Sequence, residues 1–276
     1  MINLAVKLLG RRTAWRASRA FYMAARGETP NGIDVNGEAD LIRACVAAAD
    51  PARGFAAIDV GANLGAWSQV VLDESKARGT TARLDLFEPV PGALARLRAR
   101  FADERRATIH AIAASDTVGE AQMNIVGDHA GTNSLSPSID PAASAITVPT
   151  TTLDAFVGGE RHVDLIKIDA EGHDFAILRG LGEALARRQV GVVQFEYNWR
   201  WLTNGASLYA VFDWLPAGYA LGRVAPGGIE LIERWVPELD RFFEGNFALV
   251  DEALLDTLPV RHTRWDESNA LVPLTR

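Results

Sequence analysis

The chain has 276 residues, a length that suits one or two domains. Its 28 Lys and Arg residues against 35 Asp and Glu residues leave a net charge of −7, which argues against a general nucleic-acid-binding protein. The single cysteine, Cys45, excludes an internal disulfide framework and a multi-cysteine zinc site, and it favours a reducing, cytoplasmic location.

Residues 1–27 hold six Lys and Arg residues and no acidic residue, so the rest of the chain carries −13. The first apolar stretch precedes the arginines and is too short for a signal peptide or for the roughly 18 residues of a membrane span. We expect residues 1–50 to form an N-terminal helical extension. One interpretation is a helix that packs on the body through Leu8, Trp15 and Phe21; the alternative is a helix that contacts a membrane surface or an acidic partner.

Residues 51–276 alternate short β-rich apolar runs with stretches of helical spacing, which predicts one α/β domain with a mostly parallel sheet and helices on both faces. The predicted strands are Phe55–Val60, Ala82–Glu88, Thr108–Ala113, Val163–Asp169 and Val190–Glu196. The predicted helices are 64–77, 91–103, 173–179 and 181–188.

Two later regions depart from this rhythm. Residues 117–150 are rich in Gly, Ser, Thr and Pro, and we interpret them as a hairpin-like insertion. One interpretation of this insertion is a mobile substrate lid that carries His129, and the favoured alternative for His129 is an exposed loop histidine. Residues 219–224, 229–232 and 246–250 predict closing strands that run antiparallel.

The turn after the first strand has the spacing D-x-G-x-x-x-G, formed by Asp59, Gly61 and Gly65, with Asn63 inside it. Glycines there let the backbone approach a ligand at the carboxyl end of the sheet. The G-x-G-x-x-G pattern of dinucleotide binding is missing. The turn therefore favours a ligand with a positive group over a pyrophosphate.

The second strand ends in Glu88, followed by Pro89. An acid at this place can accept hydrogen bonds from both ribose hydroxyls of a nucleoside. Asp59 and Glu88 together predict a nucleoside with a cationic tail, for which S-adenosylmethionine (SAM) is the common choice. Ser115 and Asp116 follow the third strand, where the adenine ring would lie.

At this point the chain resembles the FkbM family of SAM-dependent methyltransferases over residues 35–250, nearly the whole chain. The stretches that carry the resemblance are Ile58–Gly65, Phe87–Pro91, Gly131–Leu135, Thr152–Asp154, Val163–Asp174, Leu178–Gly180, Gln194–Glu196 and Gly245–Leu249. The upstream stretch Asn36–Glu38 is also similar to the family's N-terminal approach. Asp174 stands where family proteins tend to have a longer Glu.

The resemblance implies a Rossmann-like class I methyltransferase core, with a seven-stranded sheet whose last strands are antiparallel. It also implies methyl transfer from SAM to a hydroxyl of a small molecule or glycan, such as a sugar, a polyketide or another natural product. The alternatives are a SAM-binding module without activity and, less favoured, an NAD-type oxidoreductase.

A hydroxyl acceptor needs a base near the ends of the fourth and fifth strands. Asp169 ends the fourth strand and Glu171 follows in the same loop, so both are candidates for a role in the site. Lys167 is costly inside a buried strand unless it is paired, which predicts an ion pair with Asp169 or Glu196 or a direct role in the site. His173 is a candidate base or substrate contact, with an exposed helix start as the alternative.

The remaining expectations concern ligands of the site. A divalent metal such as Mg²⁺ is not expected, but if one binds, Asp169, Glu171 and Glu196 offer it hard oxygen ligands. The aromatic run from Tyr197 to Trp201 either walls the acceptor pocket or packs the C-terminal strands or a dimer contact. We expect no nucleic-acid partner, and the sequence leaves open whether the chain forms a homo-oligomer.

Overall fold

The computed structural model describes residues 2–126, 133–137, 140, 142–159, 161–265 and 271–273. The strands are β1 (Phe55–Val60), β2 (Ala82–Phe87), β3 (Ala107–His110), β4 (Ala113–Ala114), β5 (Gly119–Ile125), β6 (Ser144–Thr151), β7 (Val163–Ile168), β8 (Val190–Tyr197), β9 (Tyr219–Ala225), β10 (Gly228–Ile232), β11 (Gly245–Asp251), β12 (Val260–Trp265) and β13 (Leu271–Pro273). The helices are α1 (Ile2–Leu9), α2 (Arg11–Ala25), α3 (Glu38–Ala48), α4 (Ala66–Arg78), α5 (Pro91–Arg100), α6 (Leu153–Val157), α7 (Asp174–Arg179), α8 (Gly182–Ala186) and α9 (Leu208–Trp214), with 3-10 helices η1 (Trp199–Asn204) and η2 (Glu252–Leu254).

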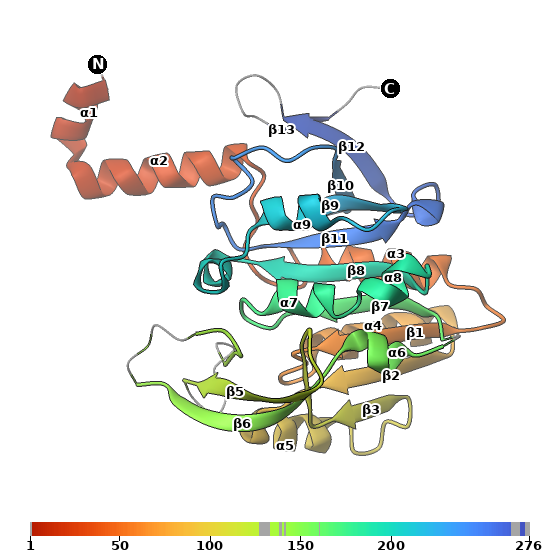
Figure 1. The fold of residues 1–276 in the computed structure, drawn as a ribbon. Helices are drawn as coiled ribbons and strands as arrows, with labels where there is room; N and C mark the ends of the chain where they lie inside the picture. Colours follow the sequence, from red (N-terminus) through yellow and green to blue (C-terminus); the bar gives the residue numbers. More distant parts are fainter. Residues whose placement is uncertain are drawn as a thin grey trace.

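Ten of the described strands form one mixed sheet in the order β13-β12-β10-β9-β11-β8-β7-β1-β2-β3 (Figure 1). The five strands from β8 to β3 in this order are parallel, as the β-α rhythm predicts. β11 lies antiparallel between β8 and β9, and β10 pairs antiparallel with β9. The predicted closing strands are therefore confirmed in place and direction.

The expected number of seven strands is wrong. The strands from β3 to β9 make a seven-stranded unit, and β10, β12 and β13 extend it at the β9 edge. β10 pairs with β12 in parallel and β12 with β13 antiparallel. The C-terminal residues that the sequence left unassigned thus add to the open edge of β10.

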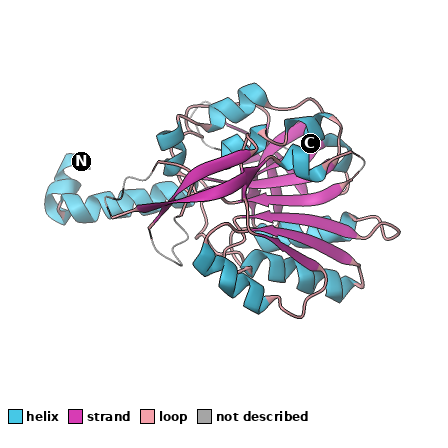
Figure 2. Cartoon of the chain, turned by 60° about the horizontal axis from the view of Figure 1, so that its bottom comes forward, coloured by secondary structure: helices cyan, strands magenta, loops and turns pink. Residues whose placement is uncertain are grey.

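Two apolar cores lie on opposite faces of the sheet, and Figure 2 shows helices on both sides of the strands. α6 to α9 pack on one face, with Ile166 and Phe195 of the strands. α3, α4 and α5 pack on the other face, with Leu165 and Val192. The face to which each strand residue contributes follows from the twofold alternation of a strand.

The helix α3 belongs to the body of the protein. Its Leu41 and Ile42 are fully buried in the core that also holds β1 and α4. A boundary between residues 50 and 51 would cut this core, so the expected division of the chain does not follow the packing. The segment that stands apart is α1 with α2.

The insertion forms a hairpin, as the sequence predicts. β5 and β6 pair antiparallel, and β4 joins β6 in a separate three-stranded sheet. The predicted strand over Thr108–Ala113 is divided, because β3 stays in the main sheet and β4 leaves it. His129 lies outside the described residues.

The two N-terminal helices project from the body (Figure 1). α2 has no buried residue, and Leu8, Trp15 and Phe21 are 79%, 63% and 78% exposed. The interpretation that these three side chains pack on the body is therefore wrong. Within the described residues, no helix combines the length and the apolarity that a membrane span requires.

Candidate active site

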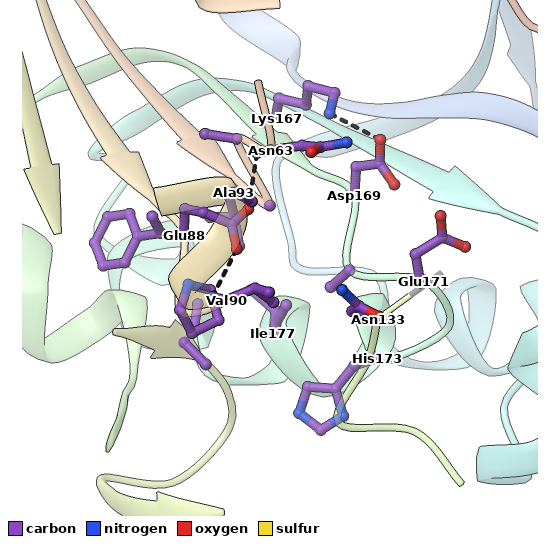
Figure 3. Close-up of a pocket in the computed structure, with 18 of the residues that line it drawn as sticks. Asn63, Glu88, Val90, Ala93, Asn133, Lys167, Asp169, Glu171, His173 and Ile177 are labelled. Atoms are coloured by element: carbon purple, nitrogen blue, oxygen red, sulfur yellow. Dashed lines mark hydrogen bonds and ion pairs between the residues drawn. The ribbon is translucent and has the colours of Figure 1, made fainter. Parts of the chain in front are cut away.

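A cavity of about 360 Å³ lies at the carboxyl ends of β1, β2 and β7 (Figure 3). Parallel strands end at the same edge of a sheet, so their terminal turns meet there. Most of the wall is apolar, with Val90, Ile112, Ala114 and Ile177 among the lining residues. Polar groups reach the cavity from the strand ends: Asn63, Glu88, Lys167, Asp169, Glu171 and His173.

The turn after β1 is shaped by left-handed backbone. Gly61 has φ 74°, and a Cβ there would collide with the carbonyl oxygen of Asp169. Asn63 has φ 48° and also lines the cavity. Gly61 therefore lets β1 and the end of β7 approach each other closely.

Gly65 serves a different contact from the one that the motif suggests. It begins α4 with φ 73°, and a Cβ there would meet the ring of Phe101 and the side chain of Leu97. It is not among the lining residues of the cavity. The second glycine of the motif thus permits α4 to pack against α5.

Glu88 lies at the cavity with both carboxylate oxygens engaged. One oxygen accepts a hydrogen bond from the backbone N–H of Asn63 at 2.8 Å and the other from Val90 at 2.8 Å. Burial raises the pKa of Glu88, against the effect of these two bonds. These hydrogen bonds fix the carboxyl group directly after the end of β2. The next residue, Pro89, also lines the cavity.

Asp59 is turned into the protein instead of the cavity. It is 1% exposed and accepts a hydrogen bond from Ser68 Oγ at 2.7 Å. Lys167 Nζ lies 3.9 Å from Asp59 and 2.9 Å from Asp169. Of the two predicted partners of Lys167, the structure therefore shows Asp169, with Asp59 behind it.

Lys167 is charged in this arrangement. Burial by itself lowers the pKa of Lys167, but the carboxylates of Asp169 and Asp59 outweigh burial and raise it. The ammonium group in turn fixes the Asp169 carboxylate, whose side chain is 34% exposed, at the cavity. Asp59 acts here by holding Lys167.

The loop after β7 is formed around Asp174, which is fully buried. Its carboxylate accepts hydrogen bonds from the backbone N–H groups of Ala170 and Gly172. Glu171, between them, has φ 53°, a conformation that costs energy for a residue with a Cβ. The shorter acid at 174 therefore shapes the loop that presents Glu171.

Glu171 is a carboxyl group at the cavity whose pKa is raised well above the ordinary value of a glutamate. Burial, reinforced by the nearby Asp169, raises the pKa of Glu171 to about 8. Arg200 Nε lies 3.1 Å from the Glu171 carboxylate and opposes this rise. A carboxyl group with such a pKa can accept a proton from a hydroxyl in the transition state and release it to solvent.

Glu196 comes close to these groups from β8. Oxygen atoms of Asp169, Glu171 and Glu196 lie within 4.8 Å of one another. Glu196 accepts a hydrogen bond from Asn198 Nδ2 at 2.7 Å, and burial raises the pKa of its carboxyl group. It is not among the lining residues of the cavity. The structure thus brings together the three acids that the sequence offers to a metal.

His173 lies at the wall of the cavity, 2.9 Å from Ser115 Oγ through its Nε2. Burial lowers the pKa of His173, so the ring is neutral at neutral pH. Ser115 and Asp116 are not among the lining residues, and Asp116 pairs with Arg179 at 2.6 Å. Ser115 therefore does not line the cavity itself but contacts His173, which does.

A second depression of about 180 Å³, called the groove below, adjoins the cavity, because Glu171 lines both. Its lining residues are Asn124, Val126, Ser134, Ser136, Pro137, Asp140, Glu171, Trp199, Arg200 and Thr203. Trp199 is 41% exposed, whereas Tyr197 and Trp201 are buried in the core. The aromatic run therefore contributes Tyr197 and Trp201 to the core and Trp199 to the groove.

Several residues at the site carry no local motif. Glu38 of α3 and Ile33 line the cavity, and Asn31 Nδ2 lies 3.4 Å from Glu196. Asn133, which also lines the cavity, stands inside the stretch Gly131–Leu135 that supports the family resemblance. Glu38 belongs to the stretch Asn36–Glu38, which is similar to the family's N-terminal approach, whereas Asn31 has no such signal.

Comparison with known proteins now adds to this geometry. The sequence pattern of the methyltransferase FkbM domain matches residues 59–222, more than half of the chain. The chain belongs to the FkbM methyltransferase family. The matched residues run from the Asp59 turn through the Glu171 loop and the groove side chains Trp199 and Arg200. Among curated proteins, none matches the chain.

Solved structures show weaker likenesses to this FkbM-family chain. An FkbM methyltransferase from Methylobacillus flagellatus shares 16% identity over 71% of this chain and 43% of its own, with a TM-score of 0.45. A putative caffeoyl-CoA O-methyltransferase from Staphylococcus aureus shares 10% identity over 90% and 98%, with a TM-score of 0.44. The N-methyltransferase NodS from Bradyrhizobium japonicum shares 10% over 78% and 94%, with a TM-score of 0.40. The chain thus spans less than half the length of the first of these proteins.

Proposed function

We propose that this chain is a SAM-dependent O-methyltransferase that acts on a hydroxyl of a small molecule or glycan. The observation that carries the proposal is the position of Glu171. Its carboxyl group lines both the cavity and the groove, and its pKa is raised to about 8. A proton acceptor belongs at such a junction, where a methyl donor and an acceptor hydroxyl would meet.

The cavity has groups suited to each part of SAM. Glu88 would accept hydrogen bonds from the ribose hydroxyls. The apolar side chains that line the cavity, Val90 and Ile177 among them, suit the adenine ring. The carboxylate of Asp169 favours the positive sulfonium centre. When bound there, SAM supplies an electrophilic methyl group.

The groove has groups suited to a polyhydroxylated acceptor. Ser134, Thr203 and Arg200 offer hydrogen bonds, and the exposed part of Trp199 offers a flat apolar face for a sugar or another ring. Glu171 would take the hydroxyl proton as the new carbon–oxygen bond forms and the carbon–sulfur bond breaks. The products are the methyl ether, S-adenosylhomocysteine and a proton that leaves through Glu171.

The first test measures ligand binding by calorimetry on the metal-stripped protein. We expect S-adenosylhomocysteine to bind with micromolar affinity and NAD⁺ not to bind. Absence of binding by S-adenosylhomocysteine, or binding of NAD⁺ alone, would overturn the assignment of the cavity as a SAM site.

The second test separates an enzyme from a binding module. Protein with SAM labelled in the methyl group is incubated with a panel of sugars, polyketides and phenols, and labelled products are analysed by mass spectrometry. We expect label on an oxygen atom of at least one compound. Binding without transfer to any class would favour the module, and label on nitrogen would contradict O-methylation.

A metal is not required in this proposal, because Lys167 and Arg200 already supply positive charge at Asp169 and Glu171. Activity measured after removal of metal ions, and again with added Mg²⁺, tests this point. A rate that depends on Mg²⁺ would instead favour metal ligation by Asp169, Glu171 and Glu196.

A further inference from the structure

The helices α1 and α2, called the arm below, expose large apolar side chains that no core covers. Leu8, Trp15 and Phe21 are between 63% and 79% exposed, and Leu9 is 57% exposed. Exposed apolar side chains gathered in one segment mark an interaction surface, whereas single ones are ordinary. Their gathering on two successive helices therefore calls for a partner.

The residues of α2 are segregated around the helix. At 3.6 residues per turn, Arg12, Arg16 and Arg19 share one side. Trp15 and Tyr22, seven residues apart, lie together, and Phe21 falls with the alanines on the side away from Arg16. α2 is thus an amphipathic helix with three of its four arginines on its polar side.

The arm is attached to the body at its last turn. Arg26 is buried and donates hydrogen bonds to Glu28 at 2.8 Å and to the Glu238 carboxylate at 3.0 Å. The ring of Tyr22 lies 5.6 Å from that of Phe243. The attachment fixes where the arm leaves the body and leaves the rest of α2 exposed.

The charge of the arm selects among partners. Residues 1–27 hold six Lys and Arg residues and no acid, and all of these cations except Arg26 are exposed. A twofold contact between two arms would bring like charges together. An anionic lipid surface instead attracts the arginines while its acyl chains accept the tryptophan, phenylalanine and leucine side chains.

We propose that the arm docks on the surface of an anionic lipid bilayer, with α2 lying in the plane of the interface. The arginines contact lipid phosphates, and Trp15, Phe21 and Leu8 enter the boundary between headgroups and acyl chains. This inference goes beyond the proposed methyl transfer and does not depend on it.

Docking would also bring the active site toward the lipid. The chain that follows the arm passes Asn31, beside Glu196, and Ile33, at the cavity. In Figure 1 the arm projects on the side of the molecule toward which β8 runs, and this is the carboxyl edge that holds the cavity. A bilayer that binds the arm would therefore lie on the side of the carboxyl edge of the sheet.

The test measures sedimentation of the full chain with vesicles of phosphatidylcholine alone and of phosphatidylcholine with one quarter phosphatidylglycerol. We expect binding to the anionic vesicles only, and weaker binding at raised salt. The triple variant R11Q/R12Q/R16Q should bind roughly 100-fold more weakly, as expected for three lost contacts with an anionic surface. The variant W15A/F21A should also lose binding.

The matched control is R78Q/R96Q/R98Q, which removes three exposed arginines from the body. It should bind vesicles as the unaltered chain does. Absence of binding to anionic vesicles, or equal losses in the control and the arm variant, would overturn the proposal. So would a dimer in sedimentation velocity that W15A/F21A dissociates, because the exposed face would then belong to a contact between two copies.

Discussion

The cavity and the groove share Glu171, but they are built from different kinds of structure. The cavity lies on the ends of β1, β2 and β7, whose backbones are fixed by a parallel ladder. The groove is formed by the end of β5, the loop around Ser134, Glu171 and the 3-10 helix η1. One region is rigid and common to the fold, whereas the other is assembled from an insertion and loops, where substrate specificity changes most easily.

The largest expected effect is at the shared residue. Glu171→Gln keeps the shape of the side chain but removes the proton acceptor, so kcat should fall by about 10²–10⁴-fold. Binding of S-adenosylhomocysteine, measured by calorimetry, should change little. The control Glu252→Gln alters an exposed acid far from the site and should leave both quantities unchanged. Full activity in Glu171→Gln would show that another group takes the proton.

The next effect is confined to the cavity. Glu88→Gln replaces a charged acceptor by an amide, so SAM and S-adenosylhomocysteine should bind roughly 10- to 100-fold more weakly, as a hydrogen bond to a charged group contributes about 1.5–3 kcal/mol. The KM of the acceptor should stay the same. Thermal unfolding of the variant must also be measured, because Glu88 accepts hydrogen bonds from two backbone N–H groups and its replacement can destabilise the fold. Unaltered affinity in a folded variant would contradict the placement of the ribose.

The pH dependence of the rate sharpens the assignment of the base. A carboxyl group with its pKa raised to about 8 is protonated below that pH and cannot accept a proton. We therefore expect kcat to rise with pH up to about 8 and then to level, with about a tenfold loss per unit below. The same profile in Glu171→Gln should be flat. A profile that rises in both proteins below the ordinary pKa range of histidine, in keeping with the lowered pKa of His173, would favour His173 as the base.

The smallest effect is confined to the groove. Trp199→Ala removes an aromatic face, so the KM of a ring-bearing acceptor should rise about fivefold, as expected for a stacking contact of about 1 kcal/mol. The affinity for S-adenosylhomocysteine should be unchanged. Leu202→Ala, in the same 3-10 helix and 58% exposed, is the control. An equal change in both variants would mean that the helix, not the ring, matters.

The parts of the fold that the sequence predicts best are those with a local cause. The parallel strands and the β1 turn follow from apolar runs, a glycine and an acid within a few residues. Neither the inward turn of Asp59 toward Ser68 nor the contact of Gly65 with Phe101 has such a signal. Both depend on helices that return to the strand end from farther along the chain.

The same reason explains the residues of the site that the sequence missed. Glu38 lies close to Gln194, and Asn31 lies close to Glu196, more than 150 residues away. Glu38 lies in a stretch that resembles the family, but neither that stretch nor the residues around Asn31 indicate these partners, because the side chains meet only after α3 has packed on the sheet. The groove residues Ser134 and Thr203 likewise meet through the tertiary fold.

The charge of the cavity has a consequence for turnover. Four acids, Glu38, Glu88, Asp169 and Glu171, line it with the single ammonium group of Lys167. SAM carries a positive sulfonium, and the spent thioether does not. Transfer of the methyl group thus removes the charge that these acids attract, so product should leave more readily than donor. Dissociation rates of SAM and S-adenosylhomocysteine, measured by stopped flow, would show whether S-adenosylhomocysteine leaves faster than SAM.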